Sequence, residues 1–110
     1  MTDSSSNNPE PSSTAIGQRL TNISLNEKNY LPWSRAITMA LGGRLKLGHI
    51  NGQIKAPPER DTKFDEWQTN DSLVMSWIFN SMESQVYEIF AYSPTPRILW
   101  ESMNKMYGQA

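Results

Sequence analysis

Few side chains in this sequence could do chemistry. The chain has one histidine, His49, and no cysteine, so thiol nucleophiles, disulfides and cysteine-bound zinc or iron–sulfur clusters are excluded. A single histidine cannot form a two-histidine metal site, and no serine or carboxylate lies near His49 in the sequence to complete a catalytic triad. We therefore interpret His49 as a helix-end or partly buried side chain and not as a catalytic base.

Two other patterns match catalytic or phosphate-binding motifs only in part. Asp65 and Glu66 are adjacent carboxylates of the kind used in acid–base catalysis, but the helix dipole alone explains acids in the first turn of a helix. The glycine-rich stretch 42–48 lacks the Gly-Lys-Ser/Thr ending and the preceding strand of a phosphate-binding loop. The sequence thus predicts no enzyme, no cofactor, no bound metal and no small-molecule substrate.

The helical part of the chain follows a tail of different composition. Residues 1–14 contain five serines, two prolines and two asparagines, and Met1 is their only large apolar residue. Such a segment buries too little apolar surface to offset the entropy of ordering. We expect residues 1–20 to form a disordered Ser/Asn/Pro-rich tail and residues 21–110 to form one helical domain, incomplete at its carboxyl end. Without a signal peptide or a membrane-length apolar run, we expect no membrane partner and a cytoplasmic protein, with the nucleus as the alternative.

Apolar residues recur at helical spacing in five segments, which predicts an all-α fold, a small bundle of about five helices. A short extended segment with Ile23 and Leu25 should dock on the core before the first helix. Asn29 is the expected N-cap of that helix, and Gly42-Gly43 should end it in a left-handed turn. The expected helices are residues 30–41, residues 44–49, a long third helix capped by Asp61 or Thr62, residues 84–91, and a fifth helix ending at 107 that Thr95 caps with Pro96 at its first position.

Large apolar side chains on these helices are interpreted as packing, and the tryptophans as core residues and not as base-stacking platforms. Trp77 lies at the centre of the third helix, where we expect burial against the first and fifth helices, and Leu45 is expected to point inward. The predicted structural core consists of Tyr30, Trp33, Ile37, Trp67, Val74, Trp77, Ile78, Phe90, Leu99 and Trp100.

Charge is divided unevenly along the chain, although the formal net charge is only −1. Residues 35–60 carry five basic side chains and one acidic one, a net charge of +4, whereas residues 61–91 carry one basic and six acidic side chains, a net charge of −5. These are either two solvated helix faces or a basic end that meets an acidic end, within the fold or on a neighbouring copy. Nucleic-acid contact through the basic half is a weaker option. The candidate assembly or RNA contacts are Arg44, Lys46, Asp65, Glu66 and Glu88.

Two stretches of the sequence, LNEKNYLPWSR at 25–35 and KLGHINGQI at 46–54, resemble the amino-terminal Gag segment of Ty1/copia-type plant LTR retrotransposons. Glu27 stands where that family usually has glycine, which argues against a tight left-handed turn before the first helix. The resemblance covers about residues 20–107, and its continuation is carried in order and spacing by Trp67, Asn70-Asp71, Ser76-Trp77-Ile78, Asn80-Ser81, Leu99-Trp100 and Tyr107.

The resemblance implies a capsid-type helical module of a Gag polyprotein, which self-associates into virus-like particles around element RNA. It implies other Gag copies as partners, hence a homo-oligomer, with RNA as a weak partner of this segment. The family's cysteine-containing zinc knuckle has no counterpart in a chain without cysteine. Two alternatives stay open: a host-domesticated, Gag-derived protein-interaction adaptor, and a weak RNA-binding module.

Overall fold

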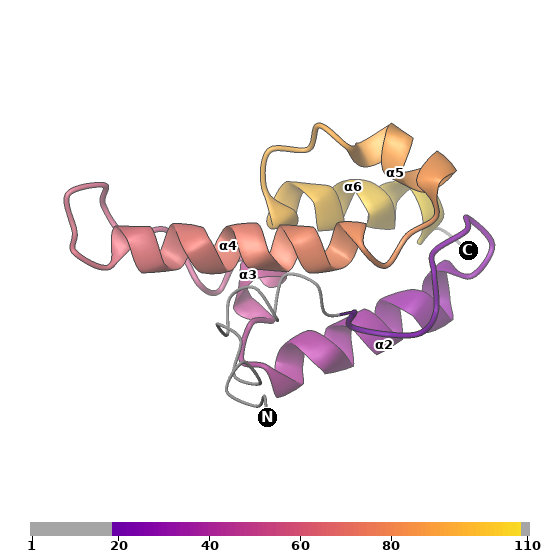
Figure 1. Cartoon of the computed structure of the whole chain (residues 1–110), viewed down its shortest axis with the longest axis horizontal. Coiled ribbons are helices and arrows are strands. Elements are labelled where there is room, and N and C mark those ends of the chain that lie inside the picture. Colours follow the sequence, from indigo (N-terminus) through magenta and orange to yellow (C-terminus); the bar gives the residue numbers. More distant parts are fainter. Residues whose placement is uncertain (1–18, 109–110) are drawn as a thin grey trace, which may run out of the picture.

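The computed structural model describes residues 19–108, and within this range the chain forms five α-helices and no strand (Figure 1). This confirms the predicted all-α class. Of the expected tail only Arg19 and Leu20 are described, and Leu20 is buried; residues 1–18 lie outside the described part of the chain. The helices are α2 (Tyr30–Gly43), α3 (Gly48–Asn51), α4 (Phe64–Phe79), α5 (Ser84–Phe90) and α6 (Pro96–Tyr107).

Helix α2 begins where the sequence predicts and buries one apolar face. Its buried residues are spaced by three or four positions, which places them along a single stripe: Tyr30, Trp33, Ile37 and Leu41. Asn29 occupies the N-cap position, but its side chain makes no capping hydrogen bond to the helix. Instead, its amide oxygen accepts from the Asn26 backbone N–H at 2.9 Å and its amide nitrogen donates to the Ser24 carbonyl at 2.9 Å. Asn29 therefore fixes the approach to the helix.

The end of α2 differs from the prediction, because the left-handed residue is Leu45 and not one of the two glycines. Leu45 has a φ of 60°, whereas Gly42 and Gly43 lie inside the helix. The Lys46 N–H donates to the Leu41 carbonyl at 2.9 Å and the Leu45 N–H to the Gly42 carbonyl at 3.1 Å, the paired bonds of a Schellman motif. This turn points Leu45 outward, 84% exposed, contrary to the expected inward position.

The same turn displaces the second helix. A helix over residues 44–49 is wrong, because the Schellman motif occupies residues 44–46 and α3 begins only at Gly48. Gly48 is required there by close packing, since a Cβ atom would collide with the Ile54 side chain. Gly52, with a φ of 82°, ends α3 in a left-handed conformation, as the Asn51-Gly52 pair indicates.

Helix α4 is the longest and forms the axis of the molecule (Figure 1). It begins at Phe64, later than a cap at Asp61 or Thr62 predicts, because the Asp61 carboxylate accepts from the Lys63 N–H at 2.8 Å and so organises the turn before the helix. Val74, Trp77 and Ile78 are its buried residues. No helix among the described residues is long and apolar enough to cross a membrane.

Helices α5 and α6 start at the predicted residues. Helix α5 ends at Phe90, one residue before the expected boundary. At α6, the Thr95 hydroxyl accepts from the Ile98 N–H at 3.1 Å and Pro96 occupies the first turn, which confirms the predicted cap. Helix α6 packs against both α3 and α4.

The segment before α2 docks on the core as an extended strand-like piece, and its partner is the α4–α5 junction. Leu25 is fully buried and forms an isolated parallel bridge with Met82. The Leu25 N–H donates to the Ser81 carbonyl at 2.9 Å, and the Glu83 N–H donates to the Leu25 carbonyl at 3.0 Å. Glu27 follows with a φ of 79°, so the expectation that this position avoids the left-handed region is wrong.

Candidate assembly surface

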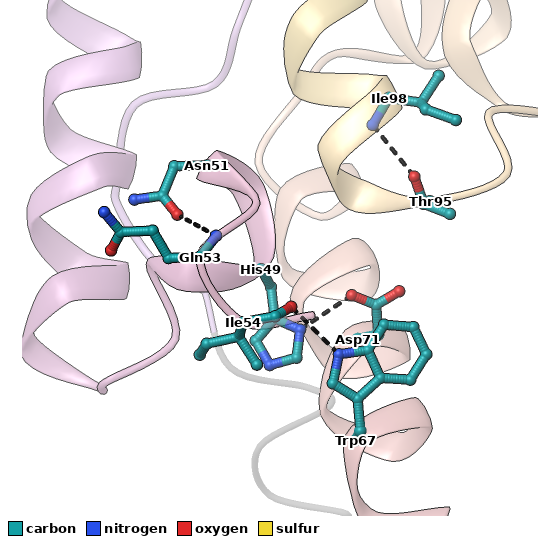
Figure 2. Close-up of polar contacts among 8 residues, drawn as sticks. All are labelled: His49, Asn51, Gln53, Ile54, Trp67, Asp71, Thr95 and Ile98. Carbon is teal, nitrogen blue, oxygen red and sulfur yellow. Dashed lines mark hydrogen bonds and ion pairs between the residues drawn. The ribbon is translucent and has the colours of Figure 1, made fainter. Parts of the chain in front are cut away.

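The single histidine is held in the core by a carboxylate that sequence distance conceals. His49, on α3, is 3% exposed at its side chain, and its Nδ1 lies 2.9 Å from Asp71 Oδ1 on α4 (Figure 2). A carboxylate only accepts, so the imidazole Nδ1–H donates. The two residues are 22 positions apart, so no local pattern in the sequence could predict the pair. The bond ties the short α3 to α4, and His49 is fully enclosed where these two helices meet.

Beside this pair, the chain that follows α3 folds back over the start of α4. The Trp67 indole N–H donates to the Ile54 carbonyl at 3.4 Å, and the Trp67 ring lies 6.3 Å from the His49 ring (Figure 2). Two adjoining hollows open here, each of about 270 Å³, and both are lined by His49, Ile54, Lys55 and Trp67. Trp67 is half-buried, and its side chain forms part of the floor that the two hollows share.

Basic side chains outnumber acidic ones around that floor, where Glu66 lines the first hollow and Asp71 the second. The first hollow is also lined by Lys46 and Lys63, and the second by Arg97. Arg97 is engaged with Glu101 at 3.1 Å. Three lysines line the hollows, and none of them forms an ion pair with a residue in the described part of the chain: Lys46, Lys55 and Lys63. We call this surface the basic groove and define it by Trp67, Ile54, Lys46, Lys55 and Lys63.

The five charged residues singled out in the sequence do not form one site. Lys46 and Glu66 line the same hollow but form no ion pair with each other. Arg44 is turned inward: its guanidinium carbon lies 5.4 Å from the centre of the Trp77 ring, and its Nη1 donates to the Ala40 carbonyl at 3.1 Å. Asp65, in the first turn of α4, and Glu88, on α5, are exposed.

The predicted core residues divide into two groups. Trp67 and Trp100 are only half-buried, and Trp100 stacks on Trp33 with ring centres 5.7 Å apart. Trp77 is 3% exposed. The residues found buried are Tyr30, Trp33, Ile37, Val74, Trp77, Ile78, Phe90 and Leu99.

A second exposed surface lies on α5 and the turn after it, and of its residues only Glu88 was among the candidates. Tyr92 is 96% exposed, Ile89 is 51% exposed, and Glu88 is exposed as well. Glu88 and Ile89 are exposed residues of α5, whose buried residues are Val86 and Phe90, and Tyr92 lies two residues beyond the end of the helix. We call Glu88, Ile89 and Tyr92 the α5 knob. The helical spacing of the apolar Val86 and Phe90, four positions apart, could have predicted that Glu88 lies on the exposed side of α5.

Two tyrosines have hydroxyl groups in the interior: Tyr30 at the start of α2 and Tyr107 at the end of α6. Burial raises the pKa of Tyr30, whose hydroxyl donates to Asn104 Oδ1 at 3.4 Å. Burial also raises the pKa of Tyr107, and the negative charge of Glu27 adds to that effect. The Tyr107 hydroxyl is buried and has no hydrogen-bond partner among the described residues. These groups are part of the packing between α2 and α6, and within the described residues no cluster of metal-ligating side chains is present.

This arrangement, a small helical module with charged surfaces and no catalytic constellation in its described part, fits the class of protein that the sequence resembles. The family described as the Gag-polypeptide of LTR copia-type matches residues 12–58. The chain is also 25% identical over 93 residues to the retrovirus-related Pol polyprotein from transposon RE2 of Arabidopsis thaliana; the match covers 76% of this chain and 6% of that protein. No solved structure matches the chain. Together these findings confirm the resemblance to the copia-type Gag of plant retrotransposons.

Proposed function

We propose that this chain is a structural module that self-associates, as a building block of Gag-type particles. The observation that carries the proposal is the match to copia-type Gag, over residues 12–58 by family and over 93 residues by the Arabidopsis relative. The chain spans only 6% of that relative, so its own role is assigned from its surfaces and not from the whole polyprotein.

The surfaces support association. Large apolar side chains on α5 and in the turn after it are strongly exposed, among them Tyr92 at 96% and Ile89 at 51%. Exposed apolar side chains that gather into a patch are typical of interaction surfaces. The division of charge is a second support. The chain has no lysine or arginine from residue 64 to residue 96, whereas three lysines that precede this segment line the basic groove. Opposite charges on one chain favour contact between copies.

Size-exclusion chromatography with light scattering over a range of protein concentrations tests the proposal. Growth of the molar mass with concentration supports self-association. A monomer at every concentration contradicts it and favours the adaptor alternative. Binding of a single-stranded RNA whose affinity falls steeply with salt, without any growth in mass, would instead identify an RNA-binding module, because phosphate neutralisation releases counterions.

A further inference from the structure

The basic groove has the character of an acceptor site. Its floor contains the half-buried Trp67 ring and the Ile54 and Pro57 side chains, and its edge carries lysines without carboxylate partners among the described residues. An aromatic floor with a cationic edge fits a tyrosine ring accompanied by a carboxylate, because the ring stacks on the indole and lysine attracts both the ring face and the acid.

The α5 knob has the complementary character. Tyr92 projects almost completely into solvent, and Ile89 and Glu88, three and four positions before it in the sequence, are exposed as well. Tyrosine is among the residues enriched at the energetic centres of protein interfaces. Glu88 is the acid of the knob, and no basic residue occurs between positions 64 and 96 to neutralise it locally.

The groove and the knob of one copy lie apart. In Figure 1 the chain after α3 and the start of α4 lie at one end of the longest axis, whereas α5 lies toward the other end. The two surfaces therefore lie on different parts of the molecule and are available to different neighbours.

We propose that the α5 knob of one copy docks in the basic groove of the next, with Tyr92 over Trp67 and Glu88 near Lys55 and Lys63. The inference rests on the proposed self-association and names the contact that produces it. Such a contact joins two different surfaces, so each added copy presents a free groove and a free knob. A heterologous interface of this kind generates a ring or an open chain of copies instead of stopping at a dimer.

Complementary variants test this arrangement by sedimentation velocity. The groove variant is Lys55→Glu with Lys63→Glu, and the knob variant is Tyr92→Ala with Glu88→Ala; all four side chains are exposed. Each variant alone should associate at least about tenfold more weakly than the parent, as expected for loss of an interface centre. An equimolar mixture should form dimers and nothing larger, since one intact knob meets one intact groove. The matched controls on α2, Arg35→Glu and Leu31→Ala, should associate like the parent.

Cross-linking gives a readout that does not require large assemblies. Because the chain has no cysteine, Ser93→Cys beside the knob and Ala56→Cys in the groove each introduce a single thiol. A mixture of the two variants should form the mixed disulfide under mild oxidation faster than a mixture of Ser93→Cys with the α2 control Met39→Cys. Equal rates in the two mixtures would overturn the inference.

The two experiments separate this inference from the proposed function. Large species that form in the parent and in all variants alike, without the selective cross-link, overturn the knob-and-groove contact and leave self-association standing. The selective cross-link in a chain that never grows beyond small species supports the contact and contradicts particle assembly. A third outcome is that single-stranded RNA binds the parent but not the groove variant, and that no selective cross-link forms. In that case the groove is a phosphate-binding surface and the inference is overturned.

Discussion

The Trp33 indole donates a hydrogen bond of 2.7 Å to the carbonyl of Ser81, 48 residues further along the chain. The same carbonyl accepts the Leu25 N–H at 2.9 Å, and the Ser81 hydroxyl donates to the Trp77 carbonyl at 3.0 Å. One buried residue thus joins the amino-terminal segment, α2 and the α4–α5 junction. Buried polar groups are costly unless paired, so this junction holds only while its partners are all in place.

Trp33→Phe should loosen that junction while leaving an aromatic ring in the core. We expect a loss of about 1–3 kcal/mol in the free energy of unfolding, from the lost hydrogen bond and the smaller ring. Hydrogen exchange at the Leu25 amide should become faster than at amides in the middle of α4. An unchanged Leu25 amide would show that the indole does not hold the segment in place.

Trp77→Ala removes the largest buried side chain of α4 and the ring under the Arg44 guanidinium. Large-to-small changes of this kind cost about 3–5 kcal/mol, which is a large part of the stability of so small a domain. Thermal melting by circular dichroism measures the loss, with the exposed Leu31→Ala as control. A midpoint for the Trp77 variant within about 3 °C of the parent, where each kcal/mol shifts it by roughly 4–8 °C, would contradict the assignment of Trp77 to the core.

Asp71→Ala leaves the buried His49 Nδ1–H without its acceptor. An unsatisfied buried donor costs about 1–3 kcal/mol, so the midpoint of thermal melting should fall by roughly 5–15 °C. Asp65→Ala, on the same helix but exposed, should have a much smaller effect. If His49→Ala and the double variant lose the same stability as Asp71→Ala, the pair acts as a unit; additive losses would show that the two residues act separately.

Local signals predicted several elements well, and contacts between distant segments explain the rest. The starts of α2, α5 and α6 follow from residues close by in sequence, such as Thr95 with Pro96 at α6. The start of α3 could not be predicted in this way, because Leu45 adopts the left-handed conformation that was expected at Gly42-Gly43. The basic groove depends on Ile54 lying against Gly48 and Trp67, and the His49–Asp71 pair depends on α3 meeting α4. Neither contact has a signature within a short window of sequence.

Raising the pH above 10 should destabilise the fold through two of its four tyrosines, Tyr30 and Tyr107. Burial raises the pKa of both Tyr30 and Tyr107 in the folded state above their ordinary value of about 10. Below that value both states keep the proton and stability is unaffected; above it the unfolded chain releases protons first, so stability falls as pH rises. Urea unfolding between pH 8 and pH 11 measures the effect, and Tyr30→Phe and Tyr107→Phe should each reduce it. A parent and a double Phe variant with the same pH dependence would contradict the prediction.

The left-handed Glu27 offers a change that should stabilise the protein. Its φ of 79° is a conformation that costs a residue with a Cβ atom about 1–2 kcal/mol, whereas glycine adopts it freely. Glycine also loses more chain entropy on folding, so the net gain from Glu27→Gly is expected to be about 0.5–1 kcal/mol. Removing the Glu27 charge should at the same time lower the pKa of Tyr107 toward its ordinary value, since that charge contributes to the raised pKa. Lys28→Gly, at a neighbouring exposed position without a positive φ, is the matched control and should destabilise slightly. Chemical denaturation of the two variants distinguishes the outcomes: if Glu27→Gly loses as much stability as Lys28→Gly, the backbone at residue 27 carries no relievable strain.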